Sequence, residues 1–89
     1  MDRQEEMRKL MKLRRILTNI KSDIRNGSYF ISLPSYENEI GLIDYPIVFG
    51  YSAIKVTLEK CERRRVPFTA AISPINSLLE IVDDRINEF

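Results

Sequence analysis

The first 25 residues constrain the fold more than any other part of the chain, because their apolar side chains repeat with the period of an α-helix. Successive members are three or four residues apart, which places them on one helical face. Asp2 is positioned to cap the start of this helix, Glu5 follows it in capping-box spacing, and Gly27 is a typical helix stop. We therefore predict an amphipathic helix over residues 3–25. Its apolar face comprises Leu10, Leu13, Leu17, Ile20 and Ile24.

A second apolar face with the same spacing lies at the other end of the chain. Ser73 and Pro74 precede it, and we interpret them as a helix N-cap followed by proline at the first helical position. Its members are Ile75, Leu79, Val82, Ile86 and Phe89. The surrounding residues are acidic: Glu80, Asp83, Asp84 and Glu88. Both faces are narrow, so each helix is expected to contact one other helix, in its own chain or in a second copy.

The middle of the chain favours strands. Short β-forming or continuous apolar runs over residues 28–33, 40–43, 45–49 and 66–72 are bounded by glycine, proline or polar residues. Segment 52–65 fits either period: Ile54 alternates with polar neighbours as in a strand, yet it also shares a helical face with Tyr51, Leu58 and Cys61. Because Ser52 is a good N-cap and the segment ends in cations, we interpret it as a helix.

These elements predict an α/β or α+β fold. We expect a small three- to four-stranded sheet containing one βαβ unit, whose right-handed crossover connects strand 45–49 to strand 66–72. The N-terminal and C-terminal helices pack on this sheet. The chain of 89 residues is predicted to form a single domain over residues 1–89, with the amphipathic helix in 1–27 and the sheet and remaining helices in 28–89.

Charge is distributed in blocks of alternating sign. Residues 1–26 carry a balance of +4, residues 27–50 of −3, residues 51–65 of +3 and residues 66–89 of −3, although the whole chain has a net charge of +1. We interpret the blocks as oppositely charged elements that lie against one another with their edges solvated.

The residue types that most catalysis requires are scarce. The sequence has no histidine, which is the commonest general base and metal ligand. Its single cysteine, Cys61, is expected to be buried and inert on the apolar face of its helix. Asp83 and Asp84 are adjacent and would point about 100° apart on a helix, which does not suit an ion site. We predict a protein that is not an enzyme, with no catalytic residue, no cofactor and no metal.

The compartment predicted from these features is the cytoplasm. The N-terminus shows no pattern of a signal peptide, no uncharged apolar run approaches the ~18 residues of a spanning helix, and a lone thiol is typical of reducing compartments. No membrane contact is expected.

The leading functional hypothesis is a small protein that acts by protein–protein contact, as a homo-oligomer, an inhibitor or a regulatory accessory protein. Such a profile is typical of compact accessory proteins of phages and mobile elements. The contact residues predicted for a partner protein or for self-association are Leu10, Leu13, Leu17, Ile20, Ile24, Leu79, Val82 and Ile86.

Two alternatives involve anions. In the first, the protein binds nucleic acid through a patch formed by two basic helices lying together. Its members are Arg8, Lys12, Arg14, Arg15, Lys21, Arg25, Arg63, Arg64 and Arg65. In the second, two helix N-termini at the carboxyl ends of parallel strands bind a phosphate or nucleotide through Gly50, Ser52 and Ser73.

Overall fold

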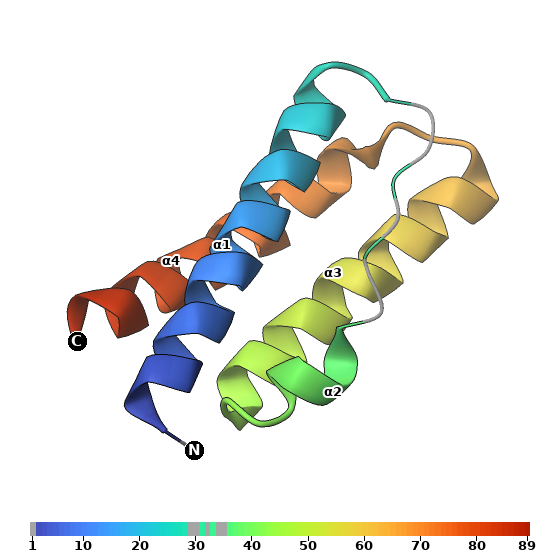
Figure 1. Ribbon diagram of the computed structural model, residues 1–89. Helices are drawn as coiled ribbons and strands as arrows, with labels where there is room; N and C mark the ends of the chain where they lie inside the picture. Colours follow the sequence, from blue (N-terminus) through green and yellow to red (C-terminus); the bar gives the residue numbers. More distant parts are fainter. Residues whose placement is uncertain (1, 29–30, 32, 34–35) are drawn as a thin grey trace.

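The computed structural model describes residues 2–28, 31, 33 and 36–89. The helices in chain order are α1 (Arg3–Arg25), α2 (Glu37–Ile40), α3 (Tyr45–Arg64), the 3-10 helix η1 (Phe68–Ala71) and α4 (Ile72–Asn87) (Figure 1). No β-strand occurs among the described residues. The predicted α/β or α+β fold, with its sheet and βαβ unit, is therefore wrong, and the chain is a small helical bundle.

Helix α1 confirms the prediction for residues 3–25. The carboxylate of Asp2 accepts a hydrogen bond from the backbone N–H of Gln4 at 3.1 Å, which satisfies one of the free donors at the helix start. After the helix, Gly27 has a φ of 75°, a left-handed conformation that costs glycine little. All five residues of the predicted apolar face are buried.

Helix α3 replaces the strand predicted over 45–49 and extends the predicted helix 52–65 upstream. Asp44 caps it by accepting from the N–H of Ile47 at 3.3 Å, and Pro46 lies in its first turn, where a missing N–H costs nothing. Gly50 does not end an element. It lies inside α3 where Leu78 packs closely, since a Cβ at this position would meet Leu78 Cδ1 at 3.0 Å.

The other predicted strands are also wrong where the structure describes them. Within 28–33, Tyr29, Phe30 and Ser32 lie outside the described residues, and the described positions are not in a strand. Segment 40–43 contains the end of α2 and a turn. Segment 66–72 contains η1, which buries Phe68 and Ala71 three residues apart, as the period of a 3-10 helix allows. Because η1 runs directly into α4, Ser73 and Pro74 lie inside the first turn and do not cap it.

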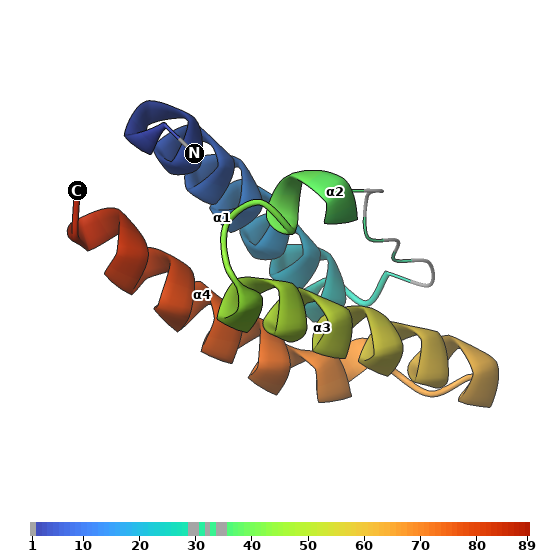
Figure 2. The ribbon, with the colours of Figure 1, turned by 90° about the horizontal axis from the view of Figure 1, so that it is seen from below.

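Helix α4 packs against both α1 and α3, whereas α2 lies beside α1 and α3 on their other side (Figures 1 and 2). The body measures 41 × 21 × 17 Å along its principal axes. Ile75, Leu78 and Val82 form the buried face of α4. This face differs from the predicted one, because it includes Leu78, whereas Phe89 is exposed. The guanidinium of Arg3 lies 5.2 Å from the centroid of the Phe89 ring.

The contact between α1 and α4 also has the expected charge complementarity. Arg14 Nε lies 2.9 Å from Asp83 Oδ1, and Arg85 lies within salt-bridge distance of Glu6, with 3.8 Å between Nη1 and Oε1. These pairs support the interpretation that the basic N-terminal block and the acidic C-terminal block lie against one another within one chain.

Candidate protein-interaction surface

The apolar faces predicted to contact a partner are used inside the chain. Leu10, Leu13 and Leu17 of α1 are fully buried, as is Val82 of α4. Ile20 and Ile24 are also buried, and Leu79 and Ile86 are partly buried against the same core. These side chains hold α1, α3 and α4 together, so a partner must find apolar surface elsewhere.

Helix α3 carries such a surface on the side that faces away from the core. Its core side is formed by Ile47, Tyr51, Ile54, Leu58 and Cys61, all buried. On the opposite side, Tyr45 is 75% exposed and Phe49 is 63% exposed, with their ring centroids 5.9 Å apart. Val56 is 47% exposed on the same side. We call Tyr45, Phe49, Ser52 and Val56 the α3 outer face; the spacing of four, three and four residues aligns them along the helix.

Local contacts fix the position of this helix. Arg85 of α4 forms a salt bridge with Asp44, the residue that caps α3, and also reaches Glu6 of α1. The start of α3 is therefore connected through one guanidinium to both other long helices. The exposed rings of Tyr45 and Phe49 consequently project from a helix that is tied to both α1 and α4.

The α3 outer face has different electrostatics at its two ends. Residues 45–54 contain no charged side chain, whereas residues 36–44, immediately before, contain three acidic residues and no lysine or arginine. Residues 55–65, at the other end, carry five basic and two acidic residues. The apolar centre of the surface is thus followed by a basic segment and preceded by an acidic one, in which Glu39 and Asp44 are paired with Lys12 and Arg85 of the same chain.

The short segment around α2 contains a buried polar cluster. Tyr36 is buried, and its hydroxyl donates to the backbone carbonyl of Lys9 at 3.3 Å. Burial, and after it the neighbouring Glu39 carboxylate, raise the pKa of the Tyr36 phenol above its ordinary value. Lys12 lies 4.9 Å from the Tyr36 ring centroid and 3.8 Å from Glu39 Oε2. This cluster attaches α2 to α1.

This cluster was not predicted from the sequence, and neither was the burial of Lys9. The Nζ atom of Lys9 lies 3.6 Å from Glu5 Oε1. Lys9 precedes Leu13 by four residues, so the two side chains are neighbours on the helix. This spacing is the sequence feature from which the burial of Lys9 could have been predicted. The contacts of Tyr36 had no such signal, because they join positions 27 residues apart.

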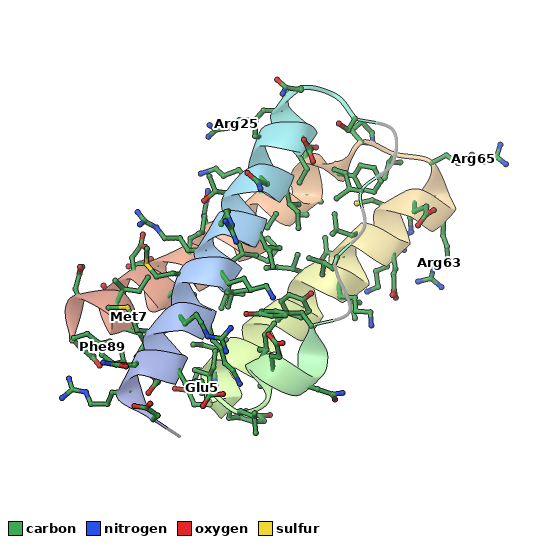
Figure 3. All side chains as sticks on the ribbon, viewed as in Figure 1. Glu5, Met7, Arg25, Arg63, Arg65 and Phe89 are labelled. Atoms are coloured by element: carbon green, nitrogen blue, oxygen red, sulfur yellow. The ribbon has the colours of Figure 1, made fainter. Side chains whose placement is uncertain are left out.

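The basic residues proposed for nucleic-acid binding are distributed over two separate regions. Residues on the outer side of α1 line a shallow hollow of about 780 Å³: Arg8, Met11, Lys12, Arg14, Arg15, Thr18 and Asn19. Arg63, Arg64 and Arg65 lie at the C-terminal end of α3. At this end of the molecule Arg25 and Arg65 extend in opposite directions (Figure 3). Lys21 of α1 is partly buried. The two basic segments therefore do not form the single patch that was predicted.

The structural premise of the anion site is also absent. Gly50 and Ser52 lie within α3, several residues after its start, and Ser73 lies in the first turn of α4. Because the described residues contain no parallel strands, they form no sheet edge at which two helix N-termini could meet. The three residues thus lack the arrangement on which the phosphate hypothesis depended.

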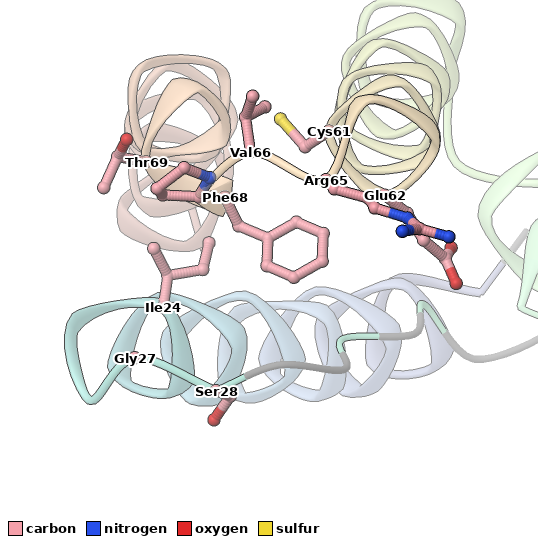
Figure 4. A pocket seen from close by; sticks show the side chains of 10 residues that line it. Ile24, Gly27, Ser28, Cys61, Glu62, Arg65, Val66, Phe68 and Thr69 are labelled. Carbon is pink, nitrogen blue, oxygen red and sulfur yellow. The ribbon is translucent and has the colours of Figure 1, made fainter.

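A pocket of about 470 Å³ lies where the C-terminal ends of α1 and α3 meet η1. Ile24, Cys61 and Phe68 contribute apolar walls, and Glu62 and Arg65 lie among its lining residues (Figure 4). Cys61 is only 4% exposed and is not in a disulfide, as expected for a buried structural thiol.

Comparison of the chain with protein families, curated proteins and solved structures gave no match. Within the described part of the chain, no helix combines the length and the apolar character needed to cross a membrane. The same residues contain no cluster of three or more metal-ligating side chains.

Proposed function

We propose that this protein works by binding another protein through the α3 outer face. The observation that carries the proposal is the position of Tyr45 and Phe49: two adjacent aromatic rings, mostly exposed, on a helix whose other side is fully packed. Exposed aromatic residues on a rigid element are typical of interface hot spots, because they bury a large apolar area at a small cost in side-chain entropy.

The surroundings of these rings support the same reading. Leu42, in the turn before α3, and Val56 extend the exposed apolar surface along the helix. Charged residues are confined to its two ends, which resembles the apolar centre and polar rim of protein interfaces.

A capture experiment with matched variants tests the proposal. Phe49→Gln and Val56→Gln remove apolar surface from the α3 outer face, and Met11→Gln is the control, since Met11 and Val56 are both 47% exposed. Immobilised protein would be incubated with an extract of the source organism, and the retained proteins quantified by mass spectrometry. We expect at least one protein that wild type and Met11→Gln retain and that Phe49→Gln retains at least about tenfold less, as for loss of a hot-spot aromatic residue.

Circular dichroism must show equal helix content in all variants. If capture and self-association are both unchanged by Phe49→Gln, the α3 outer face is not a binding surface and the proposal fails.

The outer side of α1 favours a second candidate function, nucleic-acid binding. Residues 7–22 contain six basic residues and no acidic one, and the hollow along this side is lined by Arg8 and Arg15. Replacement of both arginines by alanine should reduce the affinity for a nucleic acid and flatten its dependence on salt, measured by fluorescence anisotropy. Replacement of Arg63 and Arg64, in the separate basic region, should have a smaller effect. The absence of binding at low salt would eliminate this candidate.

A further inference from the structure

The pocket at the C-terminal ends of α1 and α3 is left open because neither helix continues its apolar face to that end. Three residues after Ile24, where α1 would add the next buried side chain, stands Gly27. A Cβ at Gly27 would meet no atom within 4 Å, so the space beside it is unfilled. Four residues after Cys61 stands Arg65, whose side chain extends away from the body of the molecule (Figure 3). The core therefore lacks an apolar side chain from each helix at this place.

The base of the pocket belongs to the packed core. Ile24 of α1, Cys61 of α3 and Phe68 of η1 are all buried. The ring of Phe68 projects into the space between α1 and α3 (Figure 4). Val66 and Pro67, in the segment between α3 and η1, also line the pocket. Because side chains packed in a core have little freedom to move, the pocket is preformed, as small-molecule sites usually are.

The wall of the pocket includes a residue in an unfavourable backbone conformation. Arg65 has a φ of 54°, and among the described residues it is the one residue other than glycine with a positive φ. Glycine adopts this left-handed conformation at less cost than a residue with a Cβ. Strained backbone positions of this kind are concentrated at ligand sites. This observation is independent of the cavity and points to the same place.

The polar groups around the pocket favour a ligand without net charge. Glu62 and Arg65 carry opposite charges and both are exposed, so neither sign of charge is favoured. Ser28 and Thr69 contribute hydroxyl groups, which hydrogen-bond to neutral polar groups. A charged ligand would have to leave water for mainly apolar walls, which is costly when no buried group of opposite charge is present.

The volume of the pocket sets the size of the ligand. The value of about 470 Å³ is roughly three times the ~150 Å³ of an apolar cavity that binds benzene. It also lies within the range of about 300–1,000 Å³ that is typical of small-molecule sites. Two fused rings therefore fit, and a flat ring system can pack against the ring of Phe68.

We infer that this pocket binds a neutral, mainly apolar molecule with two fused rings. The rings of the ligand lie against Ile24, Cys61 and Phe68, and a polar group of the ligand lies near the hydroxyls of Ser28 and Thr69. This inference goes beyond the proposed function. The pocket is on the core side of α3, and the α3 outer face contributes none of the described residues that line it.

Titration of the purified full chain with three probes of one ring system tests the class of ligand. At neutral pH indole is uncharged, indole-3-acetate is an anion and tryptamine is a cation. Measured by NMR, indole should bind with a dissociation constant of about 1 mM or less, and about tenfold more tightly than either charged probe. The absence of indole binding overturns the inference. A charged probe that binds at least as tightly as indole overturns the predicted class of ligand.

Nuclear Overhauser effects between indole and the wild-type protein locate the bound probe. We expect them to connect the ring protons of indole with the methyl groups of Ile24 and the ring of Phe68. Contacts with Phe49 and none with Ile24 or Phe68 would place the probe on the α3 outer face and overturn the assigned site.

Cys61→Phe tests the same site by filling it. Because Cys61 is only 4% exposed and lies in the wall, a larger side chain takes space from the ligand, and indole should bind at least about tenfold more weakly. Val56→Phe adds the same ring to the exposed side of α3 and is the matched control. This control and Phe49→Gln should bind indole as wild type does, whether or not the α3 outer face binds a protein.

Circular dichroism establishes that each variant is folded. Unchanged indole affinity in a folded Cys61→Phe chain overturns the assigned site. If Cys61→Phe does not fold, the contacts of indole with Ile24 and Phe68 in the wild type decide the question.

Discussion

Replacement of Tyr36 by phenylalanine isolates the hydroxyl that attaches α2 to α1. Tyr36 is 5% exposed, and its hydroxyl donates to the Lys9 carbonyl at 3.3 Å. Phenylalanine keeps the ring, and with it the packing and the contact with Lys12. The Lys9 carbonyl keeps its place in the helical ladder, so it is not left without a donor. The hydroxyl also forms a hydrogen bond with the Glu39 side chain. The expected loss is therefore about 1–2 kcal/mol in the free energy of unfolding at pH 7.

The raised pKa of Tyr36 adds a dependence on pH. Below pH ~10 the phenol is protonated in both the folded and the unfolded chain, so the contribution of the hydroxyl is fully present. Above that pH the unfolded chain loses the phenolic proton while the folded chain retains it, because burial and Glu39 disfavour the phenolate. Stability of the wild type therefore falls as pH rises toward the folded pKa, by up to about 1.4 kcal/mol per pH unit.

Urea unfolding followed by circular dichroism at pH 7, 9, 10 and 11 measures both effects. The gap in unfolding free energy between wild type and Tyr36→Phe should be constant up to about pH 9.5 and then narrow. Tyr45→Phe is the control, since Tyr45 is 75% exposed and should change little at any pH. A gap that is constant or widens to pH 11 would refute the assigned role of Tyr36.

Three further experiments test the fold, each by the urea midpoints of the variants. Arg65 ends α3 with a φ of 54°, so Arg65→Gly should stabilise by about 1 kcal/mol, and a destabilised variant would contradict the left-handed cap. Leu17→Ala should destabilise by about 2–5 kcal/mol and Met11→Ala by less than about 0.5 kcal/mol, whereas equal losses would contradict the burial of α1. A double-mutant cycle of Arg85→Met and Asp44→Asn should give a coupling of about 1 kcal/mol, because both side chains are partly solvated; zero coupling would show that Arg85 does not stabilise the cap of α3.

The parts of the fold that the sequence predicted correctly are those determined by periodicity within one helix. The period of α1 is unbroken from Leu10 to Ile24, and its caps are standard, so local information was enough. The blocks of opposite charge also predicted that oppositely charged elements lie against one another, although the two terminal helices were predicted to pack on a sheet. In α4 the period was correct but the face was rotated, because Leu78 and Leu79 are both apolar and only packing against α3 decides which is buried.

The strand predictions were wrong because short apolar runs do not distinguish a buried strand from a helix turn. Ile47, Val48 and Phe49 were interpreted as one buried run, but on a helix they point in different directions, and only Ile47 is fully buried. Gly50 strengthened the error, since glycine usually marks a boundary. The glycine at position 50 is explained by a tertiary contact, because Leu78 of α4 occupies the space that a side chain would need. That contact joins positions 28 residues apart and has no local signature.

The residues predicted as the contact surface are buried for a related physical reason. The narrow apolar faces of the terminal helices were predicted to bind a partner, but the bundle itself buries these faces. After α1, α3 and α4 have packed together, apolar side chains remain exposed at several places, among them Met11, Val66 and Phe89. Tyr45, Phe49 and Val56 are the exposed apolar residues that lie together on the second side of α3. A helix that is apolar on one side needs one neighbour, whereas α3 buries Ile54 on one side and exposes Phe49 on the other. This is why we propose its second side as the binding surface, and loss of binding without loss of stability in Phe49→Gln is the result that would support the proposal.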